Sequence, residues 1–239
     1  MRRIAAKYSE ALLNEISYVV RQQIYRKAAV DTSFSWDWDA QRYNRSALVG
    51  LLVQKSRQYA TRYLEIGCQG NVLFDAVACA HKVGLDPKSG GTHRMTSDRY
   101  FAEHPDATFD VIFVDGLHSY GQVRKDAINS LSSVAPGGWI AFHDLLPASW
   151  KEHHVPRLNR HWAGDCWKLA VELSQTEGID FRIISIDRGV GVLRMTSEEV
   201  HLVDMTDTLT DAEYDVFCEW LPKLPVITWD EAVDWISTA

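Results

Sequence analysis

The sequence lacks the features that would place the protein in a membrane or on nucleic acid. No apolar run is long enough to span a bilayer, and the first ten residues carry charges where a secretory signal would be apolar. The formal net charge is −7 with scattered lysines and arginines, so no basic stripe is available to neutralise phosphates. We therefore expect a cytoplasmic protein that binds neither membrane nor nucleic acid.

Cysteine pairs at metal-binding or redox spacing are also missing. The four cysteines are far apart and none forms a Cys-x-x-Cys pair, which is typical of buried small apolar residues. Apolar residues make up 46% of the chain, enough for a core of normal size without disulfides or a structural metal. The length of 239 residues suits one α/β domain with additions.

Strands alternate with helices through the middle of the chain. The apolar runs that predict strands are 63–66, 82–86, 109–115, 139–143, 181–186 and 190–195. The helices expected around them are 72–80, 97–103, 120–134 and 165–175, with Pro136 to Gly138 stopping the third of these. This alternation predicts a parallel sheet with right-handed crossovers, and the last two strands predict an antiparallel hairpin that closes the sheet.

The two ends of the chain have a different pattern. Apolar residues recur at helical spacing between Ser9 and Lys27, and a second helix is expected from Arg45 to Tyr59. The tail is acidic and predicts two short helices, around 211–220 and 229–236.

These patterns divide the chain into three parts. We expect a helical extension at 1–60, an α/β domain at 61–196 and an acidic tail at 197–239 that packs on that domain. The first helix is the natural candidate for an interface that assembles a homo-oligomer.

A glycine-containing loop, Glu65-Ile-Gly-Cys-Gln-Gly-Asn71, follows the first predicted strand. Gly67 and Gly70 allow a tight turn and close approach to a ligand, beside a helix N-terminus that stabilises an anion. Asp86 ends the next strand, where an acidic residue hydrogen-bonds ribose hydroxyls. The loop lacks the third glycine of a pyrophosphate cradle, and Glu65 suits a cationic sulfonium or ammonium. S-adenosylmethionine is therefore favoured over NAD.

Four polar residues follow the next two predicted strands: Asp115, His118, His143 and Asp144. Adjacent parallel strands bring them to one rim of the sheet, where an imidazole can accept a proton from a substrate. Carboxylates suit Mg²⁺ or Mn²⁺, and added histidine shifts the preference toward transition metals. The structural alternatives are a strand-end His143 bonded to a backbone carbonyl, turn or capping roles for the two aspartates, and a surface-loop role for His118.

This ordered set of motifs resembles a known family. The segment from Tyr63 to Leu146 is similar to class I S-adenosylmethionine-dependent methyltransferases, and within them to small bacterial enzymes with Asp-Gly-x-His-x-Tyr and His-Asp motifs. These motifs are Asp115 to Tyr120 and His143-Asp144, with further matching stretches at 92–98 and 162–168. The resemblance implies a doubly wound, Rossmann-like sheet of about seven strands, and it leaves the N-terminal helices and the tail unaccounted for.

The resemblance implies a cofactor site. Its residues would be Glu65, Gly67 and Gly70 around the methionine end, Asp86 at the ribose, and Ser97 and Asp98 near adenine. Asn71 and Asp115 would also bind the cofactor. A helix N-cap is the alternative role for the Ser97-Asp98 turn.

The resemblance also implies a chemical site for O-methyl transfer to a small hydroxylated acceptor such as a sugar. His118 would be the general base, Asp115 would be catalytic, and Asp115, His143 and Asp144 would hold a divalent metal such as Mg²⁺. Related enzymes usually carry another acidic residue in place of His143. Residues 162–165 either border the acceptor pocket or cap the following helix through Asp165. A hydroxylase-like enzyme on the same scaffold and a non-catalytic partner protein remain the alternative functions.

Overall fold

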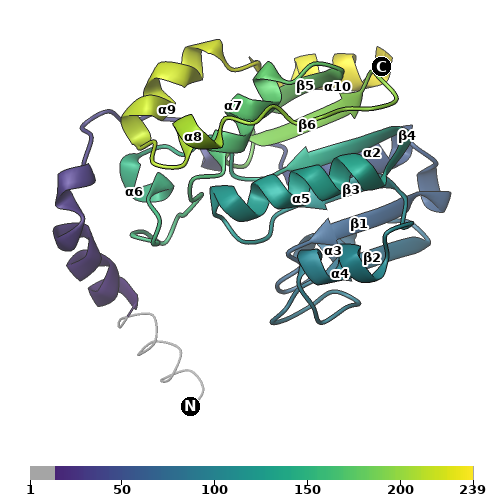
Figure 1. Cartoon of the computed structure of the whole chain (residues 1–239), viewed down its shortest axis with the longest axis horizontal. Coiled ribbons are helices and arrows are strands. Elements are labelled where there is room, and N and C mark those ends of the chain that lie inside the picture. Colours follow the sequence, from purple (N-terminus) through teal and green to yellow (C-terminus); the bar gives the residue numbers. More distant parts are fainter. Residues whose placement is uncertain (1–13, 239) are drawn as a thin grey trace.

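The computed structural model describes residues 14–238, and its centre is a twisted sheet (Figure 1). Within this part of the chain the sheet has seven strands in the order β2-β1-β3-β4-β6-β5-β7. The strands are β1 (Arg62–Ile66), β2 (His81–Leu85), β3 (Phe109–Val114), β4 (Val134–Phe142), β5 (Ile179–Ile184), β6 (Val190–Met195) and β7 (Val226–Ile227). Only the pairs that β6 forms with β4 and β5 are antiparallel. The predicted Rossmann-like, mostly parallel sheet is confirmed.

Helices cover both faces of this sheet. They are α2 (Arg45–Lys55), α3 (Val72–Ala76), α4 (Ser97–Glu103), α5 (Tyr120–Ser133), α6 (Trp150–His153), α7 (Trp167–Gln175), α8 (Thr206–Leu209), α9 (Tyr214–Trp220) and α10 (Trp229–Thr238). Short 3₁₀ turns are η1 (Arg26–Ala28), η2 (Trp38–Ala40), η3 (Gln58–Ala60) and η4 (Leu221–Lys223). Helices α4, α5 and α7 contribute to one apolar cluster, and α2, α3 and α10 contribute to a second.

The central strand β3 shows why two cores form. All six of its residues are buried, and successive side chains point to opposite faces. Ile112 and Val114 belong to the cluster with α5, whereas Val111 and Phe113 belong to the cluster with α2. A strand whose residues are all buried is therefore covered on both faces. The polar residues that follow this strand lie together at the carboxyl edge of the sheet.

The predicted C-terminal hairpin is present, but it does not close the sheet. β5 and β6 pair around the turn at Asp187 to Gly189, in the register Ile183↔Gly191. The tail adds β7 beyond β5, with Ile184 opposite Ile227. The edge of the sheet thus comes from a two-residue segment of the tail, too short to give a periodic signal in the sequence.

Two element boundaries also differ from the prediction. Helix α3 ends at Ala76 because Val77 adopts an extended conformation, four residues before the predicted end of that helix. Pro136 to Gly138 lie inside strand β4, which begins at Val134. The strand accommodates them at a register irregularity opposite Phe109 and Val111, so these residues do not mark a loop.

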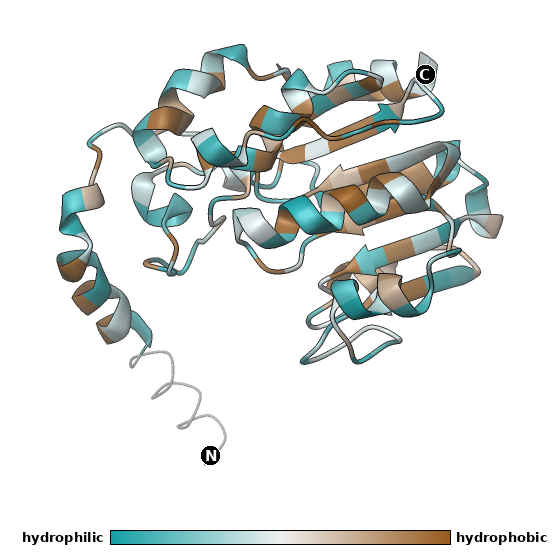
Figure 2. Cartoon of the chain, viewed as in Figure 1, coloured by the Kyte–Doolittle hydropathy of each residue, from teal (hydrophilic) through white to brown (hydrophobic). Residues whose placement is uncertain are grey.

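The N-terminal helix extends away from the sheet (Figure 1). Residues 14–24 are helical, and the predicted start at Ser9 lies outside the described residues. The apolar side chains of Ile16, Val19, Val20 and Ile24 are more than half exposed, and this apolar stripe is visible in Figure 2. Assembly through this helix remains a prediction. No described helix has the length and apolar composition to cross a membrane.

Candidate active site

A cavity of about 610 Å³ lies at the carboxyl ends of β1 to β4. Residues that follow each of these strands line it: Gly67 after β1, Asp86 after β2, Asp115 after β3 and His143 after β4. This is the edge where ligands bind in doubly wound sheets, and the volume is in the range of small-molecule and cofactor sites.

Asp86 keeps an ionised carboxylate at one end of the cavity. Its Oδ2 accepts from the backbone N–H of Gln69 at 2.8 Å, and its Oδ1 accepts from Lys88 and Ser89, each at 2.7 Å. Burial alone would raise the pKa of Asp86, but these three backbone donors lower it below its ordinary value. The structure therefore places a charged acceptor where the sequence predicts a ribose contact.

Gly67 is required by a close approach of two backbone segments. Its φ is +92°, and a Cβ on it would lie 2.0 Å from the carbonyl oxygen of Asp115. Gly70 has no such neighbour and lies outside the cavity lining. Asn71 also lies outside it, and its Oδ1 accepts from the Gly91 N–H at 2.7 Å. The contacts predicted between the cofactor and these last two residues remain predictions.

Glu65 is buried behind the cavity wall. It is 2% exposed, and its Oε2 accepts a hydrogen bond from the Tyr63 hydroxyl at 2.6 Å. Burial raises its pKa to about 7, against the opposing effect of the hydrogen bond from Tyr63. Its side chain is not part of the cavity lining, so its contact with the methionine end of a cofactor remains a prediction.

Ser97 and Asp98 line the cavity near the start of α4, and the helix is capped by another residue. The N-cap is Thr96, whose Oγ1 accepts from the Arg99 N–H at 3.3 Å. Ser97 donates to Oδ1 of Asp126 at 2.6 Å. The capping alternative for the Ser97-Asp98 turn is therefore wrong.

Asp126 is a polar lining residue that the sequence reasoning missed. It lies in α5 and is 1% exposed, and burial raises its pKa to about 6. The Gln122 side chain donates to Asp126 at 3.2 Å and to Asp98 at 2.8 Å. An aspartate in the middle of a helix looks like a solvated residue, so only the packing of α5 on the sheet reveals it.

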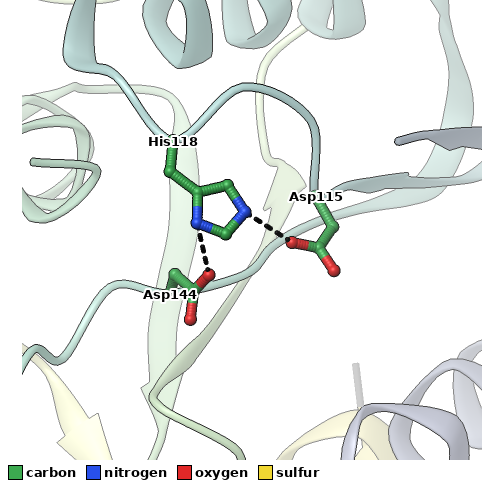
Figure 3. A group of neighbouring side chains, drawn as sticks. All are labelled: Asp115, His118 and Asp144. Carbon is green, nitrogen blue, oxygen red and sulfur yellow. Dashed lines mark ion pairs between the residues drawn. The ribbon is translucent and has the colours of Figure 1, made fainter. Parts of the chain in front are cut away.

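His118 lies between two carboxylates on the rim of the cavity (Figure 3). Its Nε2 is 3.3 Å from Asp115 Oδ1, and its Nδ1 is 3.0 Å from Asp144 Oδ2. Asp144 has a left-handed φ of 65°, and its Oδ1 is buried without a hydrogen-bond partner in residues 14–238. The structure thus brings together the two motifs that the sequence singled out.

The charges of this group favour a protonated His118 imidazole and an ionised Asp115. Burial lowers the pKa of His118, but the hydrogen bond to Asp115 and the charge of Asp144 outweigh burial and raise that pKa above its ordinary value. Burial likewise disfavours ionised Asp115, yet the charge of His143 and the hydrogen bond from His118 hold the pKa of Asp115 well below its usual range.

His143 contacts side chains of the same group. Its Nδ1 is 3.3 Å from Asp115 Oδ1 and 3.2 Å from Asp144 Oδ2, and the side chain is 3% exposed. Burial lowers the pKa of His143, and the charges of Asp144 and Asp115 raise it well above its ordinary value. The polar contacts of its ring among the described side chains are with charged groups, in contrast to the alternative of a backbone-bonded strand end.

Arg45 and Asp187 belong to the site and were missed in the sequence. Arg45 Nη1 lies 2.9 Å from Asp115 Oδ2 and 2.9 Å from His143 Nε2, and its Nε lies 3.3 Å from Asp187 Oδ2. Arg45 is the first residue of α2 and Asp187 lies in the hairpin turn, with a left-handed φ of 44°. The strained φ of Asp187 is a local signal of a functional site, and it can be seen in the structure but not in the sequence.

The segment 162–165 forms one wall of the site. Trp162 stacks on the His118 ring, with centroids 5.1 Å apart, and its carbonyl oxygen lies 3.0 Å from His118 Nδ1. Asp165 Oδ1 accepts from the backbone N–H of Tyr120 at 2.6 Å, at the start of α5, whereas the N-cap of α7 is Cys166. Of the two predicted alternatives, the structure has the segment bordering the site.

The sequence also matches a known family. The family described as "Methyltransferase domain" matches residues 23–145, which is just over half of the chain. The chain belongs to this methyltransferase family. The prediction of a methyltransferase is thereby confirmed. The matched region begins before α2 and so includes Arg45, although the N-terminal helices were expected to lie outside the family.

Solved structures resemble this methyltransferase at low identity. MycE methyltransferase of the mycinamycin biosynthetic pathway, in complex with Mg, S-adenosylhomocysteine and mycinamycin VI, is 17% identical, with a TM-score of 0.41. That match covers 64% of this chain, and this chain spans only 50% of MycE. S-adenosylhomocysteine-bound PaMTH1 of Podospora anserina is 18% identical, with a TM-score of 0.44, and the match covers 74% and 96% of the two chains.

The O-methyltransferase of Bacillus cereus, in complex with S-adenosylhomocysteine, is 15% identical. Its TM-score is 0.44, and the match covers 66% of this chain and 84% of that one. A comparison with curated protein sequences gives no match.

Proposed function

We propose that this methyltransferase transfers the methyl group of S-adenosylmethionine to a hydroxyl oxygen of a small acceptor, with His118 as general base. The observation that carries the proposal is the position of His118 between Asp115 and Asp144, on the rim of the cavity that Asp86 lines at its other end. The cofactor lies along the glycine loop, with its ribose at Asp86 and its adenine near Ser97 and Asp98.

The hydrogen bonds of His118 identify its basic nitrogen. The Trp162 carbonyl oxygen can only accept, so Nδ1 carries a hydrogen. Nε2 becomes the basic nitrogen once it has given up the hydrogen that it shares with Asp115, 3.3 Å away. In the reaction the acceptor oxygen bonds to the methyl carbon while the carbon–sulfur bond breaks, and the hydroxyl proton moves to Nε2. Asp144, 3.0 Å from Nδ1, stabilises the imidazolium that results. The raised pKa of His118 makes it a stronger base.

The rim also fits a divalent cation. Donor atoms of Asp115, His118 and Asp144 lie within 4.8 Å of one another, and the orphaned Asp144 Oδ1 is an oxygen that a hard cation would bind. We assign Asp115 and Asp144 as its carboxylate ligands and His143 as a third ligand, which leaves His118 as the base. A bound divalent ion lowers the pKa of a hydroxyl that it contacts.

Calorimetry with S-adenosylhomocysteine tests the cofactor site. We expect binding to the wild type and a loss of at least about tenfold in Asp86→Ala, because an ionised acceptor at the ribose is removed. Asp75→Ala, at an exposed acidic residue on α3, is the matched control and should bind normally. Undiminished binding by Asp86→Ala would remove the assignment.

Mass analysis of the product tests the reaction class. A gain of one methyl group on an acceptor hydroxyl, lost in His118→Asn, supports O-methyl transfer. A product without that gain would indicate the hydroxylase-like alternative, and binding of the cofactor without turnover would indicate a non-catalytic partner. Activity that is unchanged by EDTA would remove the metal from the proposal.

A further inference from the structure

One wall of the cavity is cationic, although the whole chain carries a formal net charge of −7. Arg157, Arg160, His161 and Arg188 line it, and we refer to these four residues as the cationic wall. We propose that the acceptor carries an anionic group, a carboxylate or a phosphate, and that the cationic wall binds it. This inference rests on the proposed function, because it names the chemical class of the molecule that is methylated.

The guanidinium groups of the wall have no carboxylate partner among the side chains that the structure describes. Arg45 lines the same cavity and differs, since it pairs with Asp115 and Asp187. The Nε of Arg188 is buried and has no hydrogen-bond partner among the described residues. Buried donors are nearly always satisfied in folded proteins, so this unpaired nitrogen marks a cavity-lining guanidinium that lacks part of its usual set of acceptors.

Aromatic rings and backbone oxygens hold the wall in place. The Arg157 guanidinium lies over the rings of Tyr18 and Trp162, at 5.7 and 5.8 Å from their centroids. Its Nε donates to the carbonyl oxygen of Asn159 at 2.8 Å. Arg157 is therefore ordered by contacts that leave its positive charge uncompensated, a favourable starting point for binding an anion.

Arg188 and His161 contact each other across the wall. An Arg188 Nη donates to Nδ1 of His161, so the other imidazole nitrogen carries the hydrogen and can donate to a ligand. A guanidinium presents parallel N–H groups that match the two oxygens of a carboxylate or a phosphate. The wall thus presents several donors, and its charge is opposite to that of the carboxylates at the rim.

The wall lies close to the general base in space, through Trp162. His161 precedes Trp162, and the Trp162 ring stacks on His118 with centroids 5.1 Å apart. An acceptor whose anionic group contacts the wall would extend past Trp162 and present a hydroxyl to His118. A neutral acceptor would leave the positive charges of these arginines uncompensated, which favours an anionic substrate over a plain sugar.

The test uses the full chain loaded with S-adenosylhomocysteine, after cofactor binding has been measured by itself. Inorganic phosphate and acetate are the probes, observed by ³¹P and ¹³C NMR. We expect saturable binding to the wild type that is at least about tenfold weaker in R160Q/R188Q, because charged hydrogen bonds are lost. R182Q is the matched control: Arg182 pairs with Asp180 outside the cavity, and this variant should bind like the wild type.

Two results would overturn the inference: equal affinity in R160Q/R188Q, or no saturable binding to the loaded wild type. In the second case the same probes are measured on the cofactor-free wild type, to see whether S-adenosylhomocysteine abolishes the binding. That loss would mean that the wall holds the carboxylate of the cofactor. Tighter binding of phosphate or of acetate identifies the anionic group. Failure to bind S-adenosylhomocysteine would refute the proposed function itself, whereas loss of anion binding alone would refute only the charge of the acceptor.

Discussion

Glu65 offers a direct test of the electrostatics beneath the cofactor loop. Its carboxyl is buried against the Tyr63 hydroxyl, and burial raises its pKa to about 7 from an ordinary value near 4.5. Between these two pH values the folded chain holds a proton on Glu65 that the unfolded chain releases. Stability therefore falls as pH rises through this window and is constant above it.

Glu65→Gln removes this dependence, because an amide of similar shape does not titrate. A pKa difference of about 2.5, at about 1.36 kcal/mol for each pKa unit, corresponds to about 3 kcal/mol in the free energy of unfolding. Most of that change falls between pH 5 and pH 8. Relative to the wild type, Glu65→Gln should gain that much stability on going from pH 5 to pH 8.

Urea denaturation at a series of pH values measures the effect. Glu219→Gln, at an exposed position on α9, controls for the loss of one charge. If the stability difference between wild type and Glu65→Gln is the same at pH 5 and pH 8, then Glu65 is not protonated in the folded state and the reasoning is refuted.

The same variant tests the predicted contact of Glu65 with the cofactor. A cofactor ammonium beside Glu65 would favour its ionised form, so affinity for S-adenosylhomocysteine should rise about tenfold between pH 6 and pH 8. The gain should vanish in Glu65→Gln. Equal pH dependence in both proteins would place the ammonium elsewhere.

Three further predictions concern the loop of His118. His118→Asn should lower kcat by a factor of roughly 10²–10⁴, while its affinity for S-adenosylhomocysteine in calorimetry stays unchanged. The kcat/KM of the wild type should rise with pH through a pKa above 6.5, because only a neutral imidazole accepts the proton. Asp144→Asn should move the NMR titration midpoint of His118 to lower pH and weaken Mn²⁺ binding by about tenfold or more, as measured by electron paramagnetic resonance; an unmoved midpoint would exclude the ion pair. Gly164→Ala should destabilise the fold by about 1–3 kcal/mol in urea denaturation, because its φ is +65° and a Cβ would lie 2.0 Å from the His118 carbonyl oxygen; wild-type stability would contradict this close contact.

The sequence predicts the parallel half of the sheet well because burial leaves a local pattern there. β3 is apolar except for Asp110, and the polar residues Asp115 and His118 follow the strand closely. Adjacent parallel strands end at one rim, so the meeting of Asp115 with Asp144 around His118 follows from topology. β7 could not be predicted in this way, because a strand of two residues has no periodic pattern and is defined only by its pairing with β5.

The site residues that the sequence did not reveal form ion pairs with residues that are distant in the sequence. Arg45 precedes Asp115 by seventy positions and looks like an ordinary surface residue at the start of a helix. Asp187 looks like a turn residue, and its contact with Arg45 joins the first helix of the domain to the hairpin. Ionic contacts between elements depend on how α2 packs across the sheet, and no spacing within either segment encodes that packing.

Gly67 shows how one residue can serve the cofactor loop and the base together. The sequence indicates a glycine that allows a ligand to approach, whereas in the structure the nearest neighbour of its missing Cβ is the Asp115 carbonyl oxygen. Gly164 makes the equivalent approach to the carbonyl oxygen of His118 from the opposite segment. The loop from Asp115 to His118 is thus packed between two left-handed glycines far apart in the sequence. A side chain at Gly67 would displace both the cofactor loop and the backbone that carries Asp115 and the base His118. One close backbone contact therefore couples the geometry of the cofactor site to that of the chemical site.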